Sequence, residues 1–338
     1  MKNLSRRKFA KTSIVVAIGA QGMLMPQNFI DSWQHPHDVK LAKVKKDDWR
    51  HRWNEKQDPQ AKGLTGYLNH GNLLVRYNNL PLLNYRASQT LKYPYFSPLN
   101  GPKSGLSLTT ESGLPYPHHR GLWLGCEPMD GGDYWGPTPL SVGQIRSTDL
   151  KMQDSGNDSI RFTDYCKWIR DDTESPLEDR RTFEVFVPNK HIRLLDCEFE
   201  IIALKDISIS SAKHAFFAIR CAPDIAPTYG GTLMNSEGDI GAEGTYGQPA
   251  RWCTYFGPRS LRPDIVEGIA VMDHPDNFGG ISPWFTRDYG HLSPQPFNFL
   301  KEPFQMSKGE TLVLKYRIVL YAGTPSQANL DALYEQWI

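Results

Sequence analysis

Residues Pro117 to Trp135 combine side chains that transfer protons, carry charge and stack on rings. The segment reads PHHRGLWLGCEPMDGGDYW, in which two adjacent imidazoles, His118 and His119, precede Arg120. Imidazole exchanges protons near neutral pH, and a carboxylate can act as its partner acid or base. We therefore expect acid–base chemistry on a polar substrate in this segment. The expected substrate contacts are Trp123, Glu127, Asp133 and Trp135.

The spacing of these residues predicts which of them face the substrate. If Pro117 to Leu124 is extended, successive side chains point to opposite faces. Leu122 and Leu124 then face the core, while His119 and Trp123 share the other face. His119 is therefore the first choice for acid–base catalyst. His118 and Arg120 have the parity of the core residues, and a bulge or bend near the strand entry would turn them towards the site.

A second polar cluster occurs between residues 268 and 299. Asp273-His274-Pro275 ends a short apolar run, and Phe285, Arg287, Tyr289 and His291 recur at every second position. In an extended segment those last four side chains share one face. We expect His274 and His291 to join the catalytic set, and Arg287 and Tyr289 to bind substrate, with Arg287 in the same cleft as Trp123. In the alternative, Asp273-His274-Pro275 is turn chemistry and Arg287 is a surface charge.

The elements that must position these residues are expected to be strands. Residues 181–187, 191–204 and 311–321 alternate apolar and polar side chains, the pattern of antiparallel sheets buried on one face. Residues 71–77 and 80–85, separated by Asn78 and Asn79, predict a hairpin. One helix is expected at the C-terminus, with Thr324 as its cap. The predicted fold is all-β, a sandwich of long antiparallel strands with one C-terminal helix.

Composition excludes several classes of function. The formal net charge of the 338 residues is +1, which gives no electrostatic case for nucleic acid or an anionic membrane. The five cysteines are dispersed, so a disulfide framework is not expected. After the first 30 positions no apolar run reaches the roughly 18 residues that a membrane span needs. Aromatic residues make up 12% of the chain, which suits both a thick β core and stacking on sugar rings.

The N-terminus reads as a targeting segment. Ser5 to Lys11 spell SRRKFAK, which looks like a twin-arginine export motif, and the uncharged residues 13–25 follow as a modestly apolar region. We expect residues 1–33 to be a signal peptide, 34–62 a polar linker or arm, and 63–338 a single β-sandwich domain. The expected location is periplasmic or secreted, without stable membrane insertion after the signal is removed.

Several of these segments resemble the DUF6807 family, often labelled "methane oxygenase PmoA". They are HHRGLWLGCEPMDGGDYW, ARWCTYFG, GIAVMDHPDN, PWFTRDYG and KGETLVLKYRIVLYAG, and the likeness runs from about Gly71 to the C-terminus. Here Gly121 replaces the usual Ser, and Cys126-Glu127 stand where many members carry His-Gly. The resemblance implies a β-supersandwich similar to galactose mutarotase-like proteins, a fold that usually binds carbohydrate. The oxygenase label does not follow, because the chain lacks the membrane spans that such a subunit needs.

Three functions compete at this point. The first is an exported carbohydrate-active enzyme, a hydrolase, lyase or epimerase, with a carbohydrate substrate and no cofactor. The second is a non-catalytic sugar-binding module. The third is a metal-dependent oxygenase or hydrolase with a facial triad made of His118 or His119, His274 or His291, and a carboxylate. The local spacing of the histidines does not support this third function, and we expect no metal site. The oligomeric state stays open. The candidate carboxylates for a glycosidase pair are Glu127, Asp130, Asp133, Glu237 and Glu243.

Overall fold

The computed structural model describes residues 62–156, 158–171, 173–210 and 214–338, which all belong to one compact unit beginning at Pro59. The expected signal peptide and nearly all of the expected linker lie outside the described residues. Every strand pairing within the described part of the chain is antiparallel. No helix among these residues is long and apolar enough to cross a membrane.

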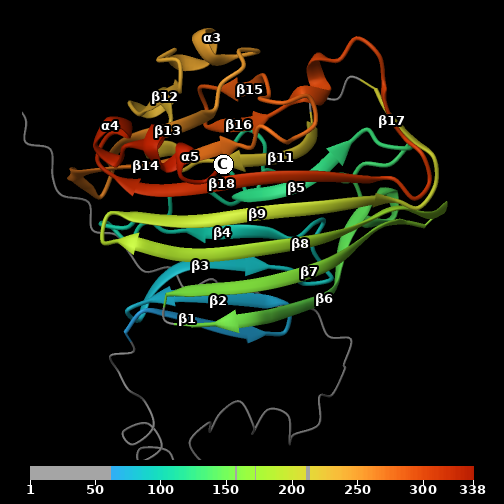
Figure 1. Cartoon of the computed structure of the whole chain (residues 1–338), viewed down its shortest axis with the longest axis horizontal. Helices are drawn as coiled ribbons and strands as arrows, with labels where there is room; N and C mark the ends of the chain where they lie inside the picture. Colours follow the sequence, from blue (N-terminus) through green and yellow to red (C-terminus); the bar gives the residue numbers. More distant parts are fainter. Residues whose placement is uncertain (1–61, 157, 172, 211–213) are drawn as a thin grey trace, which may run out of the picture. The chain divides into compact units, whose positions relative to one another are not determined.

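Two eight-stranded sheets make up most of the fold. Sheet I contains, in spatial order, β1 (Leu64–Asn69), β2 (Asn72–Tyr77), β3 (Leu80–Arg86), β4 (Tyr95–Leu99), β5 (Leu122–Glu127), β11 (His214–Arg220), β16 (His291–Pro294) and β15 (Trp284–Arg287). Sheet II contains β12 (Thr232–Asn235), β13 (Trp252–Arg259), β14 (Arg262–Asp273), β18 (Thr311–Ala322), β9 (Ile192–Ala203), β8 (Thr173–Asn189), β7 (Ser159–Arg170) and β6 (Gln144–Ser155). In Figure 1 the long strands β6–β9 and β18 of sheet II overlap β1–β4 of sheet I and run in nearly the same direction.

Shorter elements fill the edges of the two sheets. A two-stranded ribbon pairs β10 (Ile207–Ile209) with β17 (Phe304–Met306). The short helices are α3 (Gly241–Thr245), α4 (Pro325–Ala328) and α5 (Leu330–Glu335). Single 3₁₀ turns lie at Leu140–Val142, Pro223–Ile225, Pro227–Tyr229 and Pro296–Phe299.

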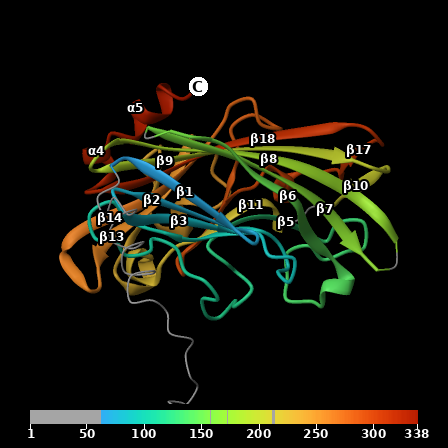
Figure 2. The same cartoon turned by 90° about the horizontal axis from the view of Figure 1, so that it is seen from below.

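Figure 2 shows the two sheets as stacked layers, and the core lies between them. Aromatic rings from both sheets meet there. Phe96 of sheet I meets Phe183 of sheet II edge-to-face with ring centroids 4.9 Å apart. Phe217 of sheet I stacks on Tyr316 of sheet II at 4.3 Å. These contacts bury the apolar face of each sheet against the other, which is the arrangement of a β-sandwich. The predicted all-β sandwich is confirmed.

The predicted strands are confirmed, and the alternation identifies their buried faces. Leu195, Cys197, Phe199 and Ile201 of β9 are all buried. The β2–β3 hairpin turns at Asn78 and Asn79, whose φ angles of 49° and 64° are left-handed. Asparagine tolerates that conformation better than most residues, which is why the pair predicts the turn.

The predicted single C-terminal helix is wrong in one respect. Thr324 caps it as expected, since its side chain accepts a hydrogen bond from the Gln327 backbone N–H in a complete capping box. The helix then breaks, because Asn329 adopts a left-handed φ of 52° that ends α4 and begins α5. The break allows Leu330 and Tyr334 to be buried against sheet II.

Candidate functional site

Strand β5 divides its side chains between two environments. Leu122 pairs with Phe96 and Leu124 pairs with Phe217, and both partners pack against sheet II. Directly paired residues of a sheet share a face, so Leu122 and Leu124 face the core. Trp123 therefore faces outward from sheet I, as the alternation predicts. The outer face of sheet I is the face on which the candidate site lies.

The expected extended run from Pro117 is broken at Gly121. Its φ of +62° is left-handed, and its backbone lies so close to Phe96 that an added Cβ would overlap the Phe96 carbonyl oxygen. Only glycine fits such an approach at low cost. The strand consequently begins at Leu122, and His118 to Arg120 lie in a bend before it, as the sequence analysis allowed. His119 still lies over the outer face, with its ring 5.3 Å from that of Trp123.

Trp135 reaches the same place through the loop that follows β5. The Tyr134 backbone N–H donates to the Cys126 carbonyl, with N···O at 3.0 Å, which holds the loop against the strand. The Asp133 carboxylate accepts bonds from the backbone N–H groups of Trp135 and Gly136 and from the Thr138 hydroxyl. Asp133 therefore shapes the loop rather than offering a carboxylate to substrate, because both of its oxygens are engaged. Trp135 meets Trp123 edge-to-face at 4.9 Å.

His291 comes from a hairpin, not from the extended segment that the sequence predicts. Residues 288–290 turn the chain, with Gly290 at φ +98°, so β15 and β16 pair and Arg287 lies opposite His291. Arg287 and His291 still share a face because they are paired across the hairpin. The Arg287 guanidinium lies over the Phe285 ring at 4.1 Å. Trp123 and Arg287 thus belong to one face, with His291 between them, 6.0 Å from Trp123.

Four rings meet on the outer face and form what we call the imidazole–indole cluster. Its members are His119, Trp123, Trp135 and His291. The two imidazole centroids are 4.7 Å apart, and each imidazole contacts both indoles. All four side chains are almost fully buried. Tyr116 stacks on His119 at 5.2 Å and covers the cluster from the solvent side.

Five buried polar atoms in this region have no hydrogen-bond partner. They are Nε1 of Trp123, Nε1 of Trp135, Nδ1 and Nε2 of His291, and Nε of Arg220. A buried polar group without a partner costs on the order of 1–3 kcal/mol, so such groups are rare in native structures. Their concentration on one face indicates a place shaped to hydrogen-bond a polar ligand.

Burial and neighbouring cations keep both imidazoles of the cluster neutral. Burial, His118 and Arg220 together lower the pKa of His119 to about 3. Burial and His119 hold the pKa of His291 well below its ordinary value. Arg220 Nη1 lies 3.3 Å from His119 Nδ1, and because a guanidinium only donates, that nitrogen accepts and the ring proton is on Nε2. His119 is suited to hydrogen bonding and poorly suited to taking a proton at neutral pH.

Strand β11 contributes two site residues that the sequence analysis missed. Arg220 pairs with His291 in the sheet register and donates to His119, while its guanidinium lies over the Tyr289 ring at 4.4 Å. His214 stacks on Trp135 at 5.3 Å. The segment reads HAFFAIR, and a signal exists there, because His and Arg six residues apart on a strand share a face.

Glu127 and His214 form a polar pair at the rim of the cluster. Glu127 Oε2 lies 3.6 Å from His214 Nδ1, and both side chains are about one-third exposed. Burial and the nearby Asp133 raise the pKa of Glu127. Burial alone would raise the pKa of Asp133, but the bonds from Thr138 and the two backbone N–H groups outweigh it and hold the pKa low. The pKa values of Glu127 and Asp133 are therefore shifted in opposite directions.

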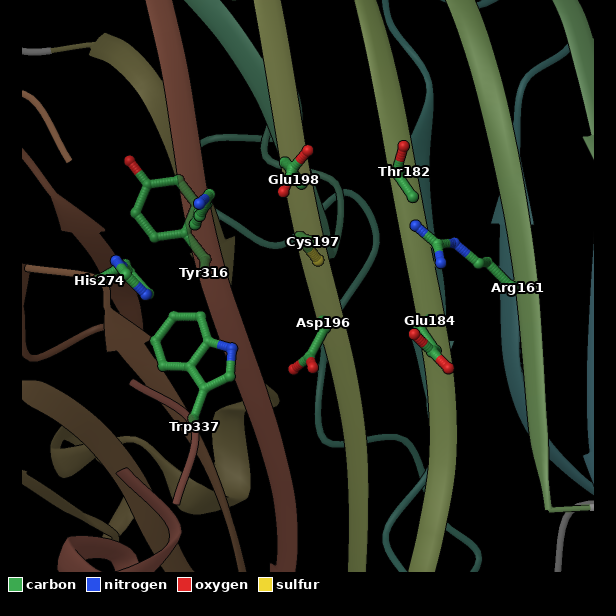
Figure 3. A pocket seen from close by; sticks show the side chains of 10 residues that line it. Arg161, Thr182, Glu184, Asp196, Cys197, Glu198, His274, Tyr316 and Trp337 are labelled. Carbon is green, nitrogen blue, oxygen red and sulfur yellow. The ribbon is translucent and has the colours of Figure 1, made fainter. Parts of the chain in front are cut away.

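His274 does not join the other predicted catalytic residues. It follows β14 of sheet II and lines a separate cavity of about 280 Å³, beside Trp337 (Figure 3). Its ring meets the Trp337 ring edge-on at 5.0 Å, and its Nδ1 accepts from the Asp276 backbone N–H. The neighbouring Asp273 is buried and accepts from Asn277 and from the Ser282 backbone. The turn-chemistry alternative describes Asp273-His274-Pro275 better than the catalytic one.

The remaining candidate carboxylates lie apart from the cluster. Asp130 forms an ion pair with Lys205, with oxygen and nitrogen 2.6 Å apart. Glu237 accepts from Ser236 on the surface, and Glu243 is exposed in α3. Among the residues that the structure describes, no three His, Cys, Asp or Glu side chains are grouped so as to hold a metal ion. The donor set thus does not fit the facial-triad alternative.

Several solved structures match the chain weakly, and their names are those of carbohydrate-active proteins. A GalM/aldose epimerase homologue from C. elegans matches at 9% identity and TM-score 0.34, covering 78% of this chain and 99% of that one. A polysaccharide lyase matches at 10% and 0.31, covering 78% of this chain and 33% of the lyase. A galactose mutarotase-related enzyme from Lactobacillus acidophilus matches at 7% and 0.27, covering 77% and 97%. At these scores the likeness assigns no activity.

No curated protein matches the chain. One family model does, and the family that it defines is described as a family of unknown function. The match runs over residues 70–335, which includes every strand of the two sheets except β1 and every residue of the imidazole–indole cluster. The chain is a member of the DUF6807 family.

Proposed function

We propose that the chain is an exported carbohydrate-active enzyme, a hydrolase, lyase or epimerase, whose sugar site is the imidazole–indole cluster and its rim. The observation that carries this proposal is the group of five unpartnered buried polar atoms on Trp123, Trp135, His291 and Arg220. Sugar hydroxyls both donate and accept, so one sugar can satisfy indole, imidazole and guanidinium nitrogens together.

Glu127 is the residue to which we assign proton transfer. It is partly exposed, and its raised pKa keeps part of the population protonated at a higher pH than an ordinary glutamate. A general acid needs a pKa near the working pH, and burial is one way to provide it. His214, 3.6 Å away, is placed to exchange a proton with it. His119 and His291, held neutral, orient the sugar by hydrogen bonds.

A non-catalytic sugar-binding module is the second candidate. The neutral imidazoles favour it, because a His119 pKa of about 3 removes the group that the sequence predicts as the catalyst. Turnover separates the two candidates, since a binding module retains affinity for sugar and converts nothing.

The test is a screen of purified protein on a panel of oligosaccharides, with product analysis that distinguishes hydrolysis, elimination and epimerisation. Glu127→Gln should lower kcat on the active substrate about 100- to 10,000-fold, the usual range for a lost general acid or base, with little change in sugar affinity. The wild-type rate should fall as pH rises through the pKa of Glu127, because a general acid acts only while protonated. That limb of the pH profile should vanish in the variant.

Asp130→Asn provides the matched control. Asp130 lies in the same loop, but its carboxylate is paired with Lys205, so its removal should leave kcat within a few fold of wild type. Equal losses in the two variants would indicate loop damage and contradict the role of Glu127. Sugar binding without any turnover on the whole panel would favour the binding module.

We propose further that the protein leaves the cytoplasm by the twin-arginine route. Support comes from the sequence alone, in which Arg6 and Arg7 precede an uncharged, modestly apolar stretch.

A further inference from the structure

An open pocket adjoins the imidazole–indole cluster and shares Trp135 with it. Its volume is about 370 Å³, and its walls include Lys92, Tyr93, His118, Arg120, Trp135 and Thr138. No aspartate or glutamate is among the residues that line it. A pocket walled by nitrogen-bearing and aromatic side chains, without a carboxylate, is suited to an anionic ligand.

Arg120 supplies an uncompensated positive charge to this pocket. Among the described residues its guanidinium makes no ion pair and no side-chain hydrogen bond, and it lies over the Tyr95 ring at 5.7 Å. Glu111 forms an isolated β-bridge with Arg120 through backbone atoms. The Glu111 carboxylate, however, forms an ion pair with Arg86 at 3.2 Å and accepts a hydrogen bond from the Tyr95 hydroxyl. The five N–H donors of Arg120 are therefore available to a ligand.

Lys92 and His118 are fixed beside Arg120. The Lys92 ammonium donates to the Thr138 hydroxyl at 2.9 Å and to the carbonyl oxygens of Thr138 and Pro139. The nearby carboxylate of Asp133 offsets part of the Lys92 charge. Lys92 therefore lines the pocket in a fixed position, but it is not the principal partner of an anionic ligand. The Tyr93 hydroxyl holds the His118 backbone carbonyl, which keeps that imidazole at the pocket edge.

We propose that this pocket binds the carboxylate of an acidic sugar, a hexuronate residue, with Arg120 as its ion-pair partner. The inference rests on the proposed function and specifies its substrate class. A planar guanidinium matches a carboxylate through two parallel hydrogen bonds. One unpaired cation also balances the single charge of a carboxylate better than the near-double charge of a phosphate ester. The sugar ring then extends from the pocket towards Trp135, the residue that the pocket shares with the cluster.

The experiment measures the affinity of the purified full chain for matched ligands by calorimetry. Glucuronate and glucose differ only at the carboxylate, glucose 6-sulfate carries one charge with tetrahedral geometry, and acetate carries the charge without a ring. Glucuronate should bind at least about tenfold more tightly than glucose, which is the value of one charge-assisted pair. Its affinity should fall as salt rises, while that of glucose should not.

Arg120→Gln should remove the preference for glucuronate over glucose, and Arg120→Lys should retain part of it. Arg262→Gln is the matched control. Arg262 is more than half exposed, pairs with the nearby Asp264, and does not line this pocket. Thermal melting of each variant shows that it is folded.

Each alternative outcome has a distinct meaning. Equal binding of glucose and glucuronate overturns this inference and leaves the proposed function standing. Tightest binding of glucose 6-sulfate overturns the carboxylate assignment. If acetate binds with the same affinity as glucuronate, the pocket is an anion site that does not recognise the sugar ring, and this result also overturns the inference. If no neutral or acidic sugar binds, the proposed function fails together with it.

Discussion

His119 is surrounded by groups that repel a proton from it. Arg220 donates to its Nδ1, His118 and His214 add to the unfavourable environment, and its ring is buried among Tyr116 and the indoles. A residue of this kind fixes the orientation of a ligand hydroxyl without changing charge. In the function that we propose, proton transfer is therefore assigned to the partly exposed Glu127 at the rim.

We expect the imidazole of His119 to stay neutral with its proton on Nε2 throughout the range from pH 5 to pH 8. The lowered pKa of about 3 means that the ring takes up a proton only well below this range. Nitrogen-15 NMR of labelled histidine should show a constant Nε2–H tautomer signal for His119. In Arg220→Met the removal of a positive neighbour should raise the pKa of His119. A wild-type signal that becomes doubly protonated near pH 6 would contradict this arrangement.

At the residue scale, the sequence predicted correctly which sheet face the β5 side chains occupy, but it did not predict the lowered pKa of His119. Alternation along 122–124 placed Trp123 outward and Leu122 and Leu124 inward, because strand parity is a local property. The neutral state of His119 depends on Arg220, which lies about a hundred positions further along the chain. Only the pairing of β5 with β11 brings the two together, and no local pattern predicts that pairing.

At the scale of elements, the bend before β5 determines where the site lies. Gly121 turns the chain so that His118 and Arg120 meet the pocket while His119 lies over Trp123. Gly121 also donates to the Thr110 carbonyl and accepts from the Arg220 backbone N–H, so the same bend connects β5 to β11.

Gly121→Ala should therefore destabilise the protein by more than about 2 kcal/mol, since an added Cβ would overlap the Phe96 carbonyl oxygen as well as strain a left-handed residue. Gly105→Ala is the control, because Gly105 has a similar φ of +71° with nothing within 4 Å of the added carbon. That variant should lose only the roughly 1 kcal/mol expected of backbone strain. Urea unfolding measures both free energies. Similar losses at the two positions would show that the contact with Phe96 is unimportant.

Hairpins mark the limit of what the sequence predicted at this scale. The Asn78-Asn79 turn was predictable because its residues favour left-handed φ. The turn at 288–290 was missed because Phe285, Arg287, Tyr289 and His291 alternate without interruption, and Gly290 was the only local sign of a reversal. The four side chains nevertheless gather on one face, since pairing across a hairpin preserves the parity that an extended strand would give.

At the scale of the whole molecule, the two sheets present different outer faces. The outer face of sheet I carries the rings and unpartnered donors. The outer face of sheet II carries rows of opposite charges, such as Arg317 with Asp196 at 2.7 Å, in the cavity region of His274 and Trp337. Sequence alternation shows that each sheet has one polar face, but it cannot show that the unpartnered indole and imidazole nitrogens gather on the outer face of sheet I.

Export by the twin-arginine route predicts a simple result. Replacing Arg6 and Arg7 with lysine preserves the charge and removes the paired guanidinium groups, so precursor should accumulate in the cytoplasm and the exported fraction should fall. Immunoblots of cell fractions measure both pools. Lys45→Arg, in the expected linker, is the control and should leave export unchanged. Normal export of the double variant would contradict the proposed route.

The five cysteines have a consequence for the order of folding and transport. Cys126, Cys166, Cys197, Cys221 and Cys253 are all buried as free thiols in the folded chain. A chain that reached an oxidising compartment unfolded would expose every one of them to random oxidation, and any cross-link formed there would have to be undone before the sheets could close. If the chain folds in the reducing cytoplasm before it is exported, its five thiols are already buried when it reaches the oxidising compartment. The folded β-sandwich therefore protects its cysteines from oxidation in the compartment where we propose that the protein works.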